Sequence, residues 1–154
     1  MSIPNFHVVN AISPIADFAA TSFDSDIVRV EGEGILFIIY SGAVSGAAAS
    51  TVTVEACSTI TATAVATVPF IYRACVATDI WGEWTAAAAT GFSADNTVAG
   101  SMWQIWVDSA ELAEEGYKYV RLSGDETSNF TILGGVLAIV MGGRYEPRIT
   151  TLLT

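Results

Sequence analysis

The stretch STVTVEACSTITATAVATVPFIY, residues 50–72, decides the fold class of this chain, because apolar and hydroxyl side chains alternate along it almost without a break. Valine and alanine alternate with threonine and glutamate up to Cys57, and alanine alternates with threonine after it. Successive side chains of a strand point to opposite faces, so this period of two predicts two strands, each with an apolar face and a threonine face. Pro69 cannot donate to a sheet ladder, so we expect it at an edge or a bulge.

Similar patterning, interrupted by turn residues, extends over most of the chain. We expect strands at residues 27–30, 35–41, 50–57, 59–75, 82–88, 101–107, 116–122 and 128–141. A single short helix is expected from Asp108 to Glu115, where Asp108 or Ser109 can cap the free amide groups. Short strands separated by Gly, Ser, Asp and Asn predict an all-β antiparallel sandwich or barrel. Parallel βαβ units are disfavoured, because strands do not alternate with long helical patterns.

The charge of the chain argues against two classes of partner. Sixteen acidic residues stand against six basic ones, a formal net charge of -10 over 154 residues. Such a chain repels phosphate backbones and anionic lipid, so we expect neither nucleic acid nor a membrane as partner. The longest apolar stretch, from Ile132 to Met141, is shorter than the about 20 residues that a membrane helix needs. The first fifteen residues lack the pattern of a signal peptide, so we expect synthesis in the cytoplasm.

The N-terminal residues lack a steady period. Residues 1–26 mix prolines and asparagines with scattered apolar residues, three of them phenylalanines, and regular patterning begins at Ile27. Disordered tails are poor in aromatics, so this segment is predicted to be an arm that docks on a neighbour or on the flank of its own domain. The expected organisation is therefore an arm (1–26), a β-sandwich domain (27–147) and a C-terminal tail (148–154).

The residues that usually carry chemistry are nearly absent. His7 is the single histidine, and it lies in the irregular segment, so a histidine-dependent nucleophile is not expected. Cys57 and Cys75 lie eighteen positions apart without zinc-ligand spacing, and we expect both to be free thiols. Acidic turns at 24–26 and 31–33 lack the calcium-loop pattern and are interpreted as solvated. The sequence thus assigns no catalytic, cofactor-binding or metal-binding residue.

Four tryptophans leave several alternatives open. Trp81 and Trp84 could pack the end of the sandwich, form an interface with a subunit or partner, or stack on a sugar. Asp79 and Glu83 lie beside them, so a glycoside hydrolase is a further alternative. The other two tryptophans lie on one predicted strand, 101–107, out of phase with each other. They are therefore expected to face opposite sides of it.

Several segments together resemble the small decoration, or cement, proteins of tailed-bacteriophage heads. They are the strands TVTVEA and TATAVATVPFIYRA, the D-x-W-G-x-W element at 79–84, the segment AELAEEGYKYVRL at 110–122 and the closing GGRYEP at 142–147. The resemblance covers roughly residues 27–147. It implies a jelly-roll sandwich, commonly a homotrimer, on the outer surface of the capsid, where it ties neighbouring major capsid subunits together.

A protein of that family holds surfaces together and is not an enzyme, and it needs no cofactor. The candidate interface residues are Phe6, Phe18, Phe23, Trp81, Trp84, Arg144, Arg148, Leu152 and Leu153. A carbohydrate-binding β-sandwich for recognition of a host or receptor remains the alternative, with the two tryptophans of the 79–84 element as its stacking surface.

Overall fold

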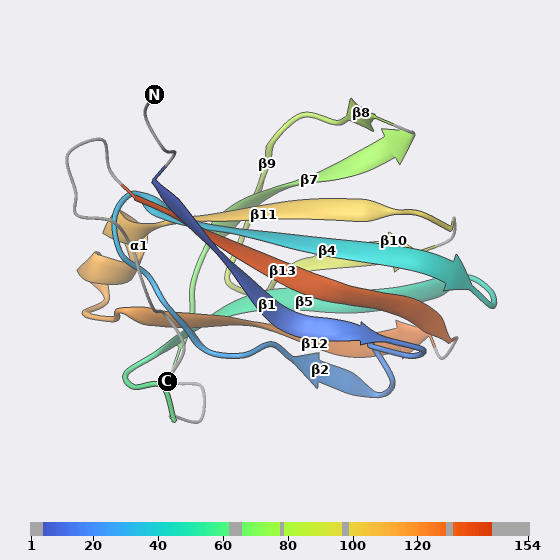
Figure 1. Cartoon of the computed structure of the whole chain (residues 1–154), viewed down its shortest axis with the longest axis horizontal. Coiled ribbons are helices and arrows are strands. Elements are labelled where there is room, and N and C mark those ends of the chain that lie inside the picture. Colours follow the sequence, from blue (N-terminus) through green and yellow to red (C-terminus); the bar gives the residue numbers. More distant parts are fainter. Residues whose placement is uncertain (1–4, 62–65, 78, 97–98, 129–130, 143–154) are drawn as a thin grey trace.

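Two antiparallel sheets pack face to face, with one short helix at one end (Figure 1). The computed structural model describes residues 5–61, 66–77, 79–96, 99–128 and 131–142. The all-β sandwich expected from the alternating sequence is confirmed.

The larger sheet has seven strands. In spatial order they are β1 (Phe6–Ile15), β13 (Ile132–Met141), β4 (Gly34–Val44), β11 (Met102–Asp108), β7 (Phe70–Ala77) and β8 (Ile80–Trp81), with β9 (Thr85–Ala87) also paired to β7. The six-stranded sheet has the order β10 (Phe92–Asn96), β5 (Ala48–Cys57), β12 (Tyr119–Ser128) and β2 (Ser22–Asp24), with β3 (Val28–Arg29) paired to β12 and β6 (Ala66–Thr67) paired to β5. The helix α1 (Ser109–Glu114) connects β11 to β12.

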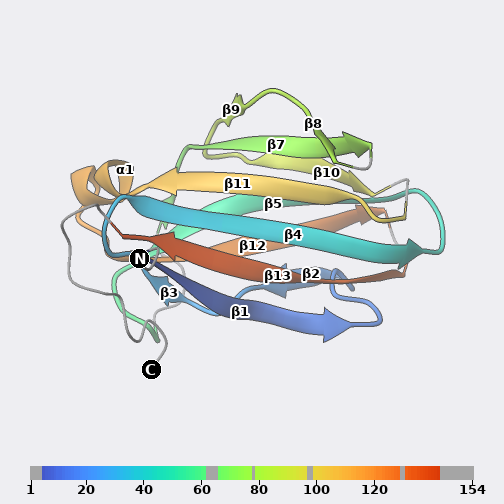
Figure 2. The ribbon, with the colours of Figure 1, turned by 45° about the horizontal axis from the view of Figure 1, so that its top comes forward.

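The strand pairing is nested. β1 pairs with β13, β2 with β12, β4 with β11, and β5 with β10. The chain is thus one long hairpin whose arms fold over into two sheets, which is the jelly-roll topology that the resemblance implied. Strands β6 to β9 are an insertion at the tip of that hairpin, between β5 and β10, and β7 extends the seven-stranded sheet beyond β11 (Figure 2).

The core lies between the inner faces of the two sheets. Alternation places every second side chain of the long strands there. Fully buried examples are Ile35 and Phe37 of β4, Val52 and Val54 of β5, Ile105 and Val107 of β11, Val120 and Leu122 of β12, and Val136 and Val140 of β13. The sheets are held together by this apolar layer, and side chains at the other parity face outward.

The prediction of a separate N-terminal arm is corrected by the structure. Residues 6–15 form β1, an edge strand of the larger sheet, and residues 22–24 form β2 of the other sheet. Phe18 and Phe23 are buried in the core, at 4% and 7% exposure. Register shifts on both sides of Ile12 interrupt the alternation of β1, so its sequence shows no steady period. The described part of this segment therefore belongs to the sandwich itself, as strands of both sheets.

Other boundaries also differ from the expectation. Residues 59–75 do not form one bent strand: β6 belongs to the six-stranded sheet and β7 to the other, with Pro69 between them. Strand β10 lies between the expected strands 82–88 and 101–107, where no strand was predicted. The predicted helix is confirmed, and Asp108 caps it by accepting a hydrogen bond from the backbone N–H of Ala110 at 2.8 Å.

Candidate functional site

The outer face of the seven-stranded sheet carries a row of apolar side chains across five strands. Val8 of β1 lies opposite Ile139 of β13, which lies opposite Leu36 of β4. Leu36 in turn lies opposite Trp106 of β11, which lies opposite Ile71 of β7. Directly opposite side chains contact one another on a sheet face, so the row is continuous.

A second row runs beside the first. It consists of Asn10, Leu137, Ile38, Gln104 and Arg73, opposite one another in that order. These two rows together are named the outer sheet face. Phe6 and Met141 flank it at one end, where they lie opposite each other, and Tyr40 and Met102 flank it at the other.

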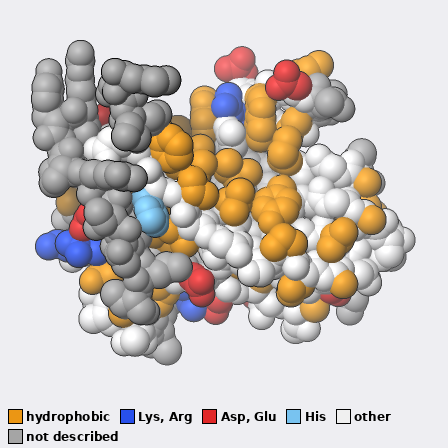
Figure 3. All heavy atoms as spheres, viewed as in Figure 1, with side chains coloured by type: hydrophobic (Ala, Val, Ile, Leu, Met, Phe, Trp, Pro, Cys, Tyr) orange, Lys and Arg blue, Asp and Glu red, His pale blue; other side chains and the backbone are white. Residues whose placement is uncertain are grey.

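The outer sheet face is open to solvent in this chain. Val8 is 49% exposed, Ile71 is 37% exposed, and the flanking Phe6 is 49% exposed. The side chains in the middle, such as Leu36 and Ile38, are half-buried. Hydrophobic side chains are spread across this side of the molecule in the space-filling view (Figure 3).

The outward faces of the two sheets differ in chemistry. On β5 and β12 most outward positions are polar, and Arg121 there pairs with Asp24 at 2.9 Å and with Glu55 at 2.7 Å. Burial opposes the charge of Arg121, but its hydrogen bond to Glu55 and the two carboxylates raise its pKa above the ordinary value. An antiparallel sheet commonly has one face on the core and one polar face in water, as this sheet does. The first row of the outer sheet face is apolar throughout, whereas Asn10, Gln104 and Arg73 lie in the second row. Exposed apolar patches mark interaction sites.

Arg73 is the charged member of the outer sheet face, and it is already engaged. Its Nε donates a hydrogen bond to Oε1 of Gln104 at 2.7 Å. Its guanidinium lies 5.1 Å from the ring centre of Trp81 and 4.6 Å from that of Trp84. A cation over an aromatic face is attracted by the ring quadrupole, so the pair of rings fixes the guanidinium at the border of the face.

The structure brings Trp81 and Trp84 together around Arg73, a partner that sequence reasoning missed. The β7–β8 hairpin does this, because Trp81 lies opposite Cys75, two residues from Arg73 on the same side of β7. Trp84 remains 42% exposed, and the neighbouring Ile80 is 58% exposed. The cluster therefore extends the apolar surface beyond β7.

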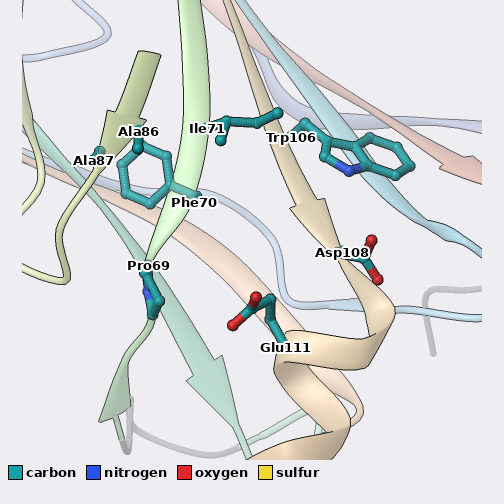
Figure 4. Close-up of a pocket in the computed structure, with 8 residues that line it drawn as sticks. All are labelled: Pro69, Phe70, Ile71, Ala86, Ala87, Trp106, Asp108 and Glu111. Carbon is teal, nitrogen blue, oxygen red and sulfur yellow. The ribbon is translucent and has the colours of Figure 1, made fainter. Parts of the chain in front are cut away.

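A pocket of about 350 Å³ opens at the β7 end of the apolar row (Figure 4). Ile71 and Trp106 line it and also belong to the outer sheet face. Pro69, Phe70, Ala86 and Ala87 form its other apolar wall, and Asp108 and Glu111 lie on the side of α1. The pocket is thus a notch at the margin of the same surface.

The remaining candidate interface residues lie in different parts of the molecule. Phe6 lies outward beside the outer sheet face. Phe18 and Phe23 belong to the chain's own core, so their assignment to an intermolecular interface is wrong. Arg144, Arg148, Leu152 and Leu153 lie outside the described residues, and their role stays a prediction.

Trp103 and Trp106 face opposite sides of β11, as expected. Trp103 is buried between the sheets, whereas Trp106 is half-buried on the outer sheet face. The outer sheet face itself was not identified from the sequence, although a signal was present. The run ILFIIYS at 35–41 is apolar at both parities, which is typical of a strand covered on both sides.

Groups capable of chemistry are dispersed in the part of the chain that the structure describes. That part holds no group of three or more His, Cys, Asp and Glu side chains suited to a metal ion. Asp79 and Glu83 are both exposed, on either side of β8. The two cysteines, both within the described residues, form no disulfide, and burial raises the pKa of the Cys57 thiol. Within the described residues, no helix has the length and apolar character needed to cross a membrane.

Comparison with known proteins adds no relative: no family model, no curated protein and no solved structure matches this chain.

Proposed function

We propose that this chain is a structural protein that decorates a phage capsid, as its resemblance to head decoration proteins suggests. The observation that carries the proposal is the outer sheet face, whose apolar row crosses five strands, on a chain whose other sheet presents mostly polar groups outward. A surface of this kind is used to associate with protein, and it requires no reactive side chain.

Decoration rests on repeated modest contacts. A subunit that touches several capsid subunits at once gains strong attachment, because each further contact forms at a high effective concentration. A closed oligomer multiplies those contacts, because each of its subunits presents the same capsid-facing surface to the shell. In this proposal the decorating oligomer sits on the outside of the shell and bridges neighbouring major capsid subunits.

The test is attachment to an assembled shell. The chain is expressed together with the major capsid protein encoded in the same genome, and the assembled shells are separated from free protein on a density gradient. We expect the chain to sediment with the shells in a fixed ratio and the decorated shells to resist heat better than bare ones. A chain that stays at the top of the gradient in the presence of intact shells overturns the proposal.

One observation favours the alternative of carbohydrate recognition: Trp84 keeps a large exposed surface next to Ile80. Aromatic side chains of that kind can stack on sugar rings. Binding on a glycan array that is abolished by Trp84→Ala, with the fold intact, would support this function. An array without a bound glycan removes it.

A further inference from the structure

We infer that a second copy of this chain covers the outer sheet face. The inference rests on the proposed structural role and names the occupant of the surface that carries it. Three features of the described residues support it: the charge of the face, its size, and the contrast with the rest of the molecular surface.

The outer sheet face is poor in charge although the chain is strongly acidic. The chain carries a net charge of -10, yet the two rows of the face contain no acidic residue. Their single basic residue, Arg73, is hydrogen-bonded to Gln104 and stacked on two tryptophans. A basic partner would be matched by carboxylates across the contact, because complementary charge is what selects such a partner. The occupant of this face is therefore apolar and nearly uncharged where it touches.

The size of the face suits a pair of subunits. Five strands spaced about 4.8 Å apart make each row roughly 20 Å long, and the two rows together with the flanking residues span roughly seven residues of about 3.4 Å each. This surface measures roughly 20 by 25 Å, or about 500 Å², before the relief of the side chains is counted. Side-chain relief and the adjoining tryptophan cluster bring the area towards the about 800 Å² that each partner contributes to a standard interface.

The two rows of the outer sheet face are also where two of these acidic chains can meet without opposing carboxylates, because Asp108, in the flanking row of Phe6 and Met141, lies at the margin. Elsewhere, as at Glu31 beside Arg29 and Asp24 beside Arg121, carboxylates lie on the surface. Like charges brought face to face cost free energy, which disfavours contact through those regions. A second copy carries the same surface, with a continuous apolar row and no carboxylate in either row, so both copies bury theirs in one contact.

The experiment measures mass as a function of protein concentration by sedimentation equilibrium. The test variant is Ile38→Glu, which places a charge in the middle of the outer sheet face. The matched control is Thr53→Glu, which places the same charge on the outward side of β5 in the other sheet. A milder variant, Ile38→Thr, keeps a β-branched side chain and a strand preference, and it serves if Ile38→Glu fails to fold. Circular dichroism establishes the fold of each variant.

We expect the wild-type chain and Thr53→Glu to self-associate at micromolar concentration. Folded Ile38→Glu is expected to be monomeric, and Ile38→Thr to associate at least about tenfold more weakly, a change of about 1.4 kcal/mol. A monomeric wild-type chain overturns the inference. So does an oligomer that survives folded Ile38→Glu, or Ile38→Thr at unchanged affinity.

The outcomes separate this inference from the proposed function. If the wild-type chain is monomeric but sediments with capsid shells, and Ile38→Glu abolishes this attachment, the decoration role is supported and the outer sheet face contacts the shell. If the chain self-associates but does not sediment with shells, the contact between copies is supported and the decoration role is contradicted.

Discussion

Two glycines make room for the phenylalanine rings through which the N-terminal segment packs into the core. A Cβ built on Gly134 would lie 2.9 Å from the ring of Phe18, and one built on Gly124 would collide with the ring of Phe23. The two phenylalanine rings also pack on each other, with centres 5.3 Å apart. Each glycine therefore provides the space that one aromatic ring fills, in a different sheet.

The glycine of β12 gives a sharp test of that packing. Gly124→Ala is expected to lower the free energy of unfolding by about 1 to 3 kcal/mol, because the buried ring of Phe23 has to move. The control is Gly42→Ala in β4, where the nearest atom is the exposed Leu133 side chain at 3.2 Å. Urea denaturation measures both, and equal effects of the two substitutions would contradict the packing described.

Cys57 predicts a loss of stability at alkaline pH. Burial raises the pKa of its thiol, Arg121 opposes the rise, and Glu55 and Asp24 add to it. Above the ordinary pKa of 9.0 the unfolded chain ionises this thiol while the folded chain keeps the proton. Unfolding is then favoured, by up to about 1.4 kcal/mol per pH unit between the two pKa values.

The comparison with Cys57→Ala isolates this thiol, because other groups also titrate in alkali. The wild type is expected to lose more stability than the variant between pH 8 and 10, measured by urea denaturation at each pH. Below pH 8 the difference between the two proteins should be constant. Parallel curves up to pH 10 would show that the folded state does not hold the proton.

At the scale of elements, β1 is the clearest departure from the expected arm. Its neighbouring residues Val8 and Val9 point to opposite faces, one exposed at 49% and the other buried at 3%. A strand fixes this difference, whereas a loosely docked arm would not. The near-isosteric change to threonine at each position therefore distinguishes the two descriptions.

Val9→Thr is expected to cost about 1 to 3 kcal/mol of stability, because it buries a hydroxyl group in the core. Val8→Thr is expected to change stability by less than about 0.5 kcal/mol, since its side chain is half exposed. Thermal and urea unfolding followed by circular dichroism measure both. Similar small effects of the two substitutions on stability would instead support a loosely docked arm.

Elements with strong local signals were predictable, and those set by distant contacts were not. Alternation identified β5, apolar runs identified β4 and β11, and the capping residue identified α1. β10 pairs with β5 along a short, polar sequence, and only that pairing makes it a strand. The candidate site follows the same rule: the sequence singled out Trp81 and Trp84, whereas the stacking on Arg73 depends on the register of a hairpin that no local pattern fixes.

At the scale of the molecule, the pattern of apolar residues along a strand does not show whether the layer packed on it comes from the same chain or from another. A strand that is apolar at both parities is predicted to be buried on both sides, but the sequence does not say whether its own chain or another supplies the second cover. In this fold β5 and β12 cover the inner side of β4 and β11, and nothing among the described residues forms a third layer over the outer sheet face. We therefore attribute the outward apolar side chains of β4 and β11 to the association proposed above.

The net charge of -10 makes the salt dependence of association informative. Two such chains repel each other, and salt screens that repulsion, because the Debye length falls from about 10 Å at 0.1 M to about 3 Å at 1 M. Contact through a face whose two rows carry no carboxylate is therefore expected to tighten several-fold as sodium chloride is raised over this range, measured as the dissociation constant of self-association. Attachment through ion pairs with a basic surface responds in the opposite direction. Self-association that weakens with added salt would mean that charged groups make the contact, and the outer sheet face would then need a different occupant.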